Sequence, residues 1–494
     1  MSSAHYSNRN DAEEEVDFFQ LSDVGSLSRP SDHFNKYLPP PRDSRHFAAR
    51  FFNDPVTTAL NQFSKVANYA NYVLSPSEEY ENILQSIPPI DESRVDSLQS
   101  VESLPPLPII PCSKSQCRLE PLMEEEFTSQ FAKASKGDIV ERVFCGGIVG
   151  SSLRRKLWPL LLGLTDNCDE FDWSDLESTF CHYETQWLNI LPDQELRFTA
   201  FRERKSIAER DVVRSDRSHP FYADSTGNID KLRRLLMAYI MYDFDTGYVQ
   251  GMSDLATPIL YIWDGDVVKS FWTFVQVMKL FKRNFEMSQE AISFQLKMLM
   301  KLIAATDPKF ADYLKEKDSE NCYFAFRWII CLFKREFMKG NNDDYDDCLK
   351  VWETIWSVHA SIELEEKREK EEKVNGESDN PVSAEDYSRP STPTKLTNIE
   401  LYLMSICLAI IRQERNIILM SNFDACEILK HFNTLYLKDR LTDILQHASE
   451  IWYWLKHDGG EELLYKEKKE TPVPTTEDDF VMLNDDVFSS TLHV

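Results

Sequence analysis

YFAFRWIICLFKREF, spanning Tyr323–Phe337, is the stretch of this sequence that says most about its fold. Apolar side chains would cover most of the surface of a helix formed by these residues. A helix that is apolar on nearly all sides is buried on nearly all sides. The stretch therefore predicts a central, buried α-helix.

Amphipathic helical patterns flank this stretch on both sides. In Lys231–Tyr242 the apolar residues follow the spacing i, i+3, i+4, i+7 of a helix with one buried face. These residues are Leu232, Leu235, Leu236 and Tyr239. Leu349–Trp356 and Ile399–Arg412 predict two further helices. Convincing runs of strict alternation are absent and the 14 glycines fall at segment ends, so the sequence predicts an all-α fold.

The helical pattern is confined to one region, which we predict to be a domain over 119–457. Residues 1–118 are mostly polar and proline-rich, with a short apolar segment near 47–85, and predict a mostly disordered region. Within the domain, 363–398 is charged and then rich in serine and proline. That composition predicts a surface insertion, disordered after a charged helical extension. The acidic residues 458–494 predict a disordered tail.

Composition argues against several classes of partner. The chain has 55 lysines and arginines against 82 aspartates and glutamates, a formal net charge of −27, which disfavours nucleic acid and anionic membranes. Its 10 cysteines show no paired Cys-x-x-Cys or Cys/His spacing, so we expect no metal site. The N-terminus lacks the apolar core of a signal peptide, and the longest apolar run, Tyr402–Ile411, is about half of what a bilayer requires. We therefore expect a cytoplasmic protein without a transmembrane segment.

Self-contained catalysis is not expected from this sequence. It contains no phosphate loop of the G-x-x-x-x-G-K-[ST] kind, no G-x-S-x-G and no H-E-x-x-H. Polar residues nevertheless interrupt the helical domain in Ser206–Tyr222, which carries Asp211 and Arg214 followed by Asp216 and Arg217. Such a charged stretch inside a helical domain is a candidate functional segment.

A second polar segment, 245–254, follows soon after. Gly247 and Gly251 bracket Tyr248 and Gln250 there. Glycine tolerates sharp turns, so the segment is expected to present the Gln250 amide beside a helix start. Two residues are candidate N-caps of the helix that follows: Ser253 and Asp254.

An arginine and a glutamine presented together from loops suit phosphoryl transfer. The arginine fork can stabilise charge on the transferred phosphoryl, and the glutamine amide can orient the attacking water. Because the chain lacks a phosphate loop, it would act on a nucleotide held by another protein. A structural interpretation stays open, since Asp211 and Arg214 also have the spacing of a helix-end ion pair and glycine-flanked turns often bury Gln or Tyr for packing.

These segments resemble the TBC domain of Rab GTPase-activating proteins. That family has the fingerprints R-x-x-x-W, I-x-x-D-x-x-R and Y-x-Q in this order. The matching residues are Arg154 and Trp158, then Asp211 and Arg214, then Tyr248 and Gln250. The resemblance covers roughly 138–457 and continues through FRWIICLFKREF and LKVWETIW. It implies two packed helical subdomains and acceleration of GTP hydrolysis by a Rab, with a non-catalytic scaffold for Rabs as the alternative.

The resemblance also implies a role for each matched residue. Arg214 would be an arginine finger and Gln250 a glutamine finger that positions water in place of the GTPase's own glutamine. Asp211 would orient the Arg214 loop, and Tyr248 would contact the partner's switch region and hold the turn. The protein would be an enzyme activator with no cofactor of its own, acting on GTP and Mg²⁺ bound to the partner.

The remaining positions of the fingerprints favour structural roles. Arg154 and Trp158 are expected on one helix, with the tryptophan in the core and the arginine paired nearby. The sequence departs from the family where Ala208 replaces isoleucine, although Ile207 lies one residue earlier. A local register adjustment could let Ile207 fill the space, with an effect on loop rigidity rather than on chemistry.

Within the family, three stretches look most like the branch of members 15 and 17: DVVRSDRSHPFY, MYDFDTGYVQGMSDL and FSKVANYANYVL. This resemblance implies a late-endosomal or lysosomal Rab as partner, a role in endosome–lysosome trafficking, and recruitment to endosomal, lysosomal or mitochondrial surfaces.

Two peripheral peptides have acidic residues before an aromatic-x-x-aliphatic pattern. They contain Phe480 and Leu483 near the C-terminus, and Phe18 and Leu21 near the N-terminus. Peptides of this kind add as a strand to ubiquitin-like autophagy modifiers, with two apolar side chains in pockets. Chance occurrence is the competing interpretation in a chain with 30 phenylalanines.

Overall fold

The computed structural model describes residues 106–113, 118–168, 171–286, 288–338, 344–374 and 394–465. Across these ranges the architecture is helical, which confirms the all-α prediction. Outside the helices, their backbone pairing includes an isolated parallel bridge between Leu122 and Ile148. None of the helices in these ranges is both long enough and apolar enough to cross a membrane.

The helices up to residue 281, together with the turn between α11 and α12, carry the predicted fingerprints. They are α5 (Glu124–Glu126), α6 (Lys136–Gly146), α7 (Ser151–Leu161), α8 (Ser174–Leu188), α9 (Pro192–Arg197), α10 (Thr199–Arg214), α11 (Asn228–Tyr242), α12 (Met252–Ile262) and α13 (Val267–Phe281). The later helices are α14 (Glu290–Thr306), α15 (Pro308–Glu316), α16 (Phe326–Ile330), α17 (Lys334–Phe337), α18 (Asp346–Val374), α19 (Asn398–Ser421), α20 (Ala425–Thr434), α21 (Leu441–His457) and α22 (Gly460–Tyr465). α11, α18 and α19 contain the three amphipathic segments predicted from periodicity.

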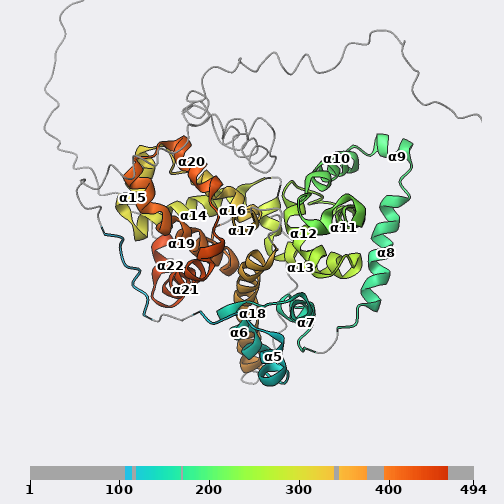
Figure 1. Cartoon of the computed structure of the whole chain (residues 1–494), viewed down its shortest axis with the longest axis horizontal. Coiled ribbons are helices and arrows are strands. Elements are labelled where there is room, and N and C mark those ends of the chain that lie inside the picture. The colour runs from blue at the N-terminus through green and yellow to red at the C-terminus, as the bar shows by residue number, and fades with distance from the viewer. Residues whose placement is uncertain are drawn as a thin grey trace, which may run out of the picture.

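Two groups of helices lie side by side, as expected of two packed helical subdomains (Figure 1). In one group α11 packs against α8, α10 and α13. In the other α19 packs against α14 and α21. α18 contacts α6 and α7 as well as α17 and α19, so it joins the earlier helices to the later group.

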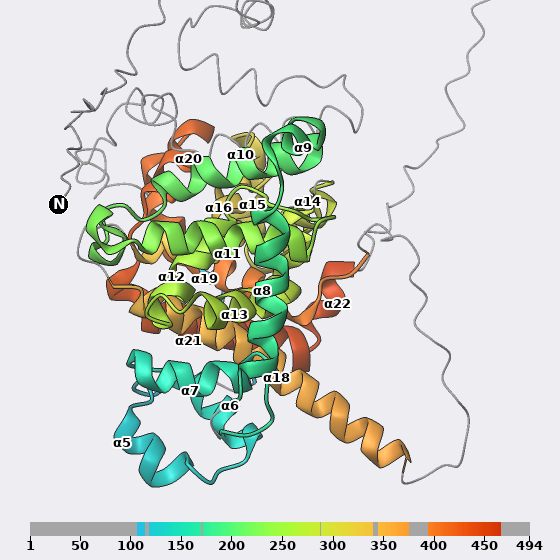
Figure 2. The same ribbon diagram turned by 90° about the vertical axis from the view of Figure 1, so that its right-hand side faces the viewer.

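The C-terminal part of α18 projects away from the helical body (Figure 2). Its sequence there, ELEEKREKEEKV, has few apolar residues to bury, so it needs no packing partner. The charged helical extension predicted at the start of 363–398 is therefore present, and the described chain resumes at 394 just before α19.

Tyr323–Phe337 is buried as predicted but is not one helix. The chain forms a 3₁₀ turn and α16, reverses at residues 331–333, and continues as the short α17. Leu332 and Phe333 adopt left-handed backbone conformations, with φ of 46° and 60°. Such conformations are disfavoured for bulky residues, so tertiary contacts must hold them.

Two contacts hold the corner between α16 and α17. The Trp352 indole N–H donates to the carbonyl oxygen of Leu332 at 2.8 Å. Across the corner, Arg327 Nε donates to Glu336 Oε1 at 2.9 Å, and both side chains are buried. The expectation of a continuous helix was wrong because periodicity reports burial and not these long-range contacts.

Both predicted boundaries of the domain also need correction. Residues 460–465, placed by the prediction in the tail, form α22, whose Leu464 is buried. Residues 106–113, placed in the disordered N-terminal region, lie against the later helices, where Ser113 donates from its backbone N and its Oγ to Asp458 at 2.8 Å each. Short segments of this kind leave a weak periodic signal.

Candidate functional site

α10 presents Arg214 at its C-terminal end. The helix turns Phe201, Ala208 and Val212 toward the core, and Arg214 is its last residue, with a side chain 36% exposed. The residue expected to lie on a loop is therefore held by a helix. Asp216 follows with a φ of 46°, so the chain turns sharply directly after the arginine.

Gln250 lies in the turn between α11 and α12. Gly247 and Gly251 have φ of 61° and 99°, left-handed values that favour glycine, so the predicted sharp turn is present. Gln250 is half-buried. Gly251 occupies the N-cap of α12, whereas Ser253 and Asp254 lie inside its first turn. The expectation that one of these two would cap the helix was wrong.

Gly247 is further restricted by Arg204, whose guanidinium lies over the Phe244 ring at 4.3 Å. A Cβ at Gly247 would come within 2.2 Å of Arg204 Nε. We expect Gly247→Ala to lower the free energy of unfolding by about 1 kcal/mol more than Gly227→Ala does. Both variants strain a left-handed backbone, but Gly247→Ala also breaks the cation–π contact. Gly227 is a matched control with a φ of 70° and open space around it. Denaturant unfolding of both variants measures the difference, and equal losses would mean that Arg204 simply moves aside.

Asp211 connects the two segments. Its Oδ2 accepts from the Tyr248 hydroxyl at 2.7 Å, and its Oδ1 accepts from Arg214 Nη2. Burial raises the pKa of Asp211, although Tyr248 and Arg214 oppose the shift. Burial, and then the charge of Asp211, hold the pKa of Tyr248 well above its usual range, so its hydroxyl stays a donor. The ion pair anticipated from the i, i+3 spacing is thus one half of a bridge between α10 and the Gln250 turn.

Tyr248 faces inward. Its side chain is 3% exposed, and its hydroxyl also accepts from the backbone N of Ser253 at 3.3 Å. This geometry holds the turn and leaves almost no surface of the ring for a partner. The expected contact of Tyr248 with a partner's switch region is therefore not supported.

Ala208 keeps the inner position on α10. It is 1% exposed, whereas Ile207 is half-buried and packs at the edge of the core. No register adjustment brings Ile207 into the place of Ala208. The helix continues without interruption to Arg214, so the smaller residue does not disturb the backbone that carries it.

Four charged residues beside these segments were not singled out together by sequence reasoning. Asp254 Oδ2 accepts from Arg335 Nη2 at 2.8 Å, and Asp216 Oδ2 accepts from Lys334 Nζ at 2.7 Å. Burial disfavours the charge on Asp254, but Arg335 and Lys334 hold the pKa of its carboxyl below the usual range. The signal available in the sequence was the Lys-Arg pair inside a mostly apolar stretch, together with acidic residues near both predicted fingers.

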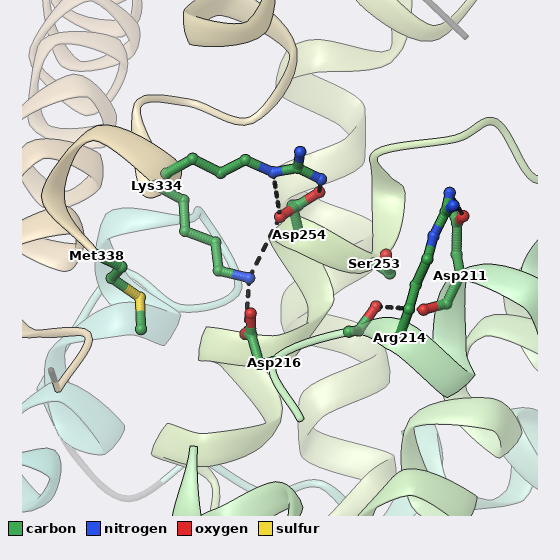
Figure 3. Close-up of a pocket in the computed structure, with 9 residues that line it drawn as sticks. Asp211, Arg214, Asp216, Ser253, Asp254, Lys334 and Met338 are labelled. Atoms are coloured by element: carbon green, nitrogen blue, oxygen red, sulfur yellow. Dashed lines mark hydrogen bonds and ion pairs between the residues drawn. The ribbon is translucent and has the colours of Figure 1, made fainter. Parts of the chain in front are cut away.

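A small open hollow lies between α10, α12 and α17 (Figure 3). Its lining residues are Asp211, Arg214, Ser215, Asp216, Ser253, Asp254, Lys334, Arg335 and Met338. Gln250 is not among them, although its turn leads directly into α12. Each of the three cations that line the hollow has an acidic partner: Arg214 pairs with Asp211, Lys334 with Asp216 and Arg335 with Asp254.

Arg154 and Trp158 lie away from this hollow, within the core. Trp158 is fully buried and its indole N–H donates to Glu353 Oε1 at 3.0 Å. Arg154 pairs with Glu353 and with Asp346, at 2.7 Å in each case. Trp158 also meets Trp356 edge to face, with ring centroids 5.2 Å apart. These contacts are structural.

The two peptide motifs cannot be placed. Phe18, Leu21, Phe480 and Leu483 lie outside the described residues, as does the apolar segment near 47–85.

Comparison with known proteins identifies the domain. Residues 151–368 match the family described as Rab-GTPase-TBC domain. The chain is similar to TBC1 domain family member 17 of Homo sapiens, at 32% identity over 87% of this chain and 59% of that protein. It is also similar to the GTPase-activating protein gyp7 of Schizosaccharomyces pombe, at 28% identity over 72% of this chain and 45% of that protein.

Among solved structures, the Ypt/Rab-GAP domain of Gyp1p aligns with a TM-score of 0.48 and 18% identity, over 67% of this chain and 95% of that domain. The chain spans 59% and 45% of the lengths of the two curated relatives named above. The matched region contains all three fingerprints. This chain belongs to the Rab-GTPase-TBC domain family, and within it is similar to family member 17.

Proposed function

We propose that the protein is a GTPase-activating protein for a Rab-family small GTPase. The observation that carries the proposal is the bridge through Asp211, which holds the Arg214 helix end against the turn that presents Gln250. The domain family and the names of the relatives support the same reading. GTP and Mg²⁺ would be held by the partner, and this chain would contribute side chains alone.

The chemistry assigned to the two side chains is different. In the complex, Arg214 would leave Asp211 and place its guanidinium against the γ-phosphoryl oxygens, where charge develops during transfer. Asp211 would keep the Tyr248 hydrogen bond, so the turn would stay in place when Arg214 moves. Gln250 would donate its amide N–H to the phosphoryl group and accept from the attacking water through its carbonyl oxygen.

Single-turnover hydrolysis of GTP preloaded on a panel of purified Rabs tests this proposal. We expect wild-type protein to accelerate at least one Rab, and Gln250→Ala to slow that reaction. The matched control is Gln186→Ala, which changes a glutamine on α8 that is half-buried like Gln250. It should behave as wild type. Binding of a GTP-loaded Rab without acceleration of any member would favour the alternative, a non-catalytic TBC scaffold.

The proposal extends to partner and place. The resemblance of three sequence stretches to the branch of members 15 and 17 is the basis for proposing a late-endosomal or lysosomal Rab, and action in the cytoplasm at endosomal, lysosomal or mitochondrial surfaces. The panel identifies the Rab. Imaging of the tagged protein on these organelles tests the place, and exclusion from all three would reject it.

Binding of ubiquitin-like autophagy modifiers through Phe480 and Leu483, or Phe18 and Leu21, is a separate proposal based on the peptide pattern. We expect Phe480→Ala to abolish capture of such a modifier by a peptide containing Asp478–Leu483, because an apolar anchor is lost. Equal capture by the variant peptide in a pull-down would exclude the C-terminal site.

A further inference from the structure

Lys334 is a buried cation in the wall of the hollow. Its side chain is 2% exposed, and its Nζ donates to Asp216 Oδ2 at 2.7 Å (Figure 3). The same Nζ donates to Thr257 Oγ1 at 2.8 Å. A third contact reaches Asp254 Oδ1 at 3.4 Å. An ammonium group has three N–H donors, so the site uses all of them. Burial opposes the charge, but Asp216 and Asp254 raise the pKa of Lys334, which keeps it protonated.

The two acids that Lys334 contacts follow the two proposed fingers in the chain. Asp216 lies two residues after Arg214, and Asp254 lies four residues after Gln250. Lys334 itself comes from α17, far away in sequence from both segments. One ammonium group therefore joins the segment that follows Arg214 to the helix that follows Gln250.

A second link joins the same two segments on the other side of the fingers. Asp211, before Arg214, accepts from the hydroxyl of Tyr248, before Gln250. The chain segments that carry Arg214 and Gln250 thus form part of a closed ring of contacts. The ring runs from Asp211 to Tyr248, along the turn to Asp254, through Lys334 to Asp216, and back along α10.

Further contacts fix the part of this ring that Lys334 holds. The Tyr345 hydroxyl donates to Asp216 Oδ2 at 2.6 Å, and Arg335 binds Asp254 through Nε at 3.1 Å and Nη2 at 2.8 Å. Asp216 has a left-handed φ of 46°, a conformation that surrounding contacts have to stabilise in a residue other than glycine. The charged partner of its side chain supplies such a contact.

We propose that Lys334 is a positioning residue that sets the distance between Arg214 and Gln250 by holding Asp216 and Asp254 together. This inference rests on the proposed function for its effect on rate. A misplacement of about 1 Å at a reacting group can slow a reaction about 10²-fold. Loss of Lys334 is therefore expected to lower kcat about 10²-fold and to change KM little, because the partner-facing surface is unchanged.

Hydrogen exchange provides a test that does not depend on activity. Lys334→Met keeps much of the side-chain volume and removes the ammonium group. We expect faster amide exchange both in the segment around Asp216 and in the first turn of α12. The control is Lys136→Met, which removes a lysine with a 12% exposed side chain that pairs with Asp166 and contacts neither segment. Unchanged exchange in the two segments of Lys334→Met would overturn the positioning role.

A double variant separates positioning from stability. In Lys334→Met combined with Asp216→Asn, the residue at position 216 carries no charge that would need a cationic partner. Much of the thermal stability lost in Lys334→Met should therefore return, while the link between the two segments stays broken. We expect kcat to remain low and exchange to remain fast in this variant. Recovery of kcat together with stability would mean that Lys334 acts through stability alone. Fast exchange in a protein whose wild type accelerates no Rab would reject the proposed function and leave the positioning role standing.

Discussion

Replacing Arg214 with alanine is expected to lower the acceleration of GTP hydrolysis about 10³–10⁵-fold, the range typical of a trans-acting arginine. The proposed function predicts this loss because no other group in the hollow is placed to take over. Lys334 and Arg335 also line it, but each is bound to Asp216 or Asp254. Arg214→Lys should recover little, since an ammonium group cannot reproduce the planar fork of a guanidinium.

Single-turnover hydrolysis with a responsive Rab measures this effect. Arg217→Ala is the matched control, because that arginine follows closely in the chain, is equally exposed at 36%, and pairs with the highly exposed Asp224. We expect the control to keep wild-type activity. Arg214→Ala should still fold, although it removes the charged partner of the buried Asp211, because Asp211 keeps its hydrogen bond from Tyr248. A catalytically normal Arg214→Ala protein would contradict the arginine-finger assignment.

Local patterns in the sequence were sufficient to predict much of the fold. The spacing in Lys231–Tyr242 predicted α11, because a helix with one buried face repeats its apolar residues at a fixed period. The same reasoning failed to predict the corner at Leu332 and Phe333, since no glycine or proline marks it in the sequence. The decisive hydrogen bond comes from Trp352, which lies 20 residues away and is invisible to local periodicity.

The contacts of the candidate site likewise include some that local sequence spacing predicts and some that it does not. The pairing of Asp211 with Arg214 was accessible because both residues lie on one helix at the i, i+3 spacing. The contacts of Lys334 with Asp216 and Asp254 span 118 and 80 residues. A lysine in a mostly apolar stretch indicates only that some acidic residue pairs with it, because an isolated buried charge is strongly unfavourable. Which acid it finds is decided by how α10, α12 and α17 pack.

Replacing Arg154 with methionine is expected to destabilise the fold by about 3–5 kcal/mol, because Glu353 would be left as a buried charge without its main partner. Glu353 is fully buried, and its remaining donors are the Trp158 indole and the backbone N of Ile148, at 3.0 and 2.9 Å. Denaturant unfolding measures the loss. Arg233→Met, which breaks a surface pair with Asp230, is the control and should cost less than about 1 kcal/mol.

The loss in Arg154→Met should also depend on pH, which distinguishes an unpaired charge from a packing defect. In the wild type, burial already raises the pKa of Glu353 above its ordinary value of 4.5, and Arg154 opposes that shift. Removing Arg154 must raise this pKa further. The folded variant then binds a proton at a pH where the unfolded chain does not, so its stability relative to wild type increases as the pH falls toward 4.5. A deficit that is the same at neutral and mildly acidic pH would attribute the loss to lost packing of the arginine, because a cavity does not titrate.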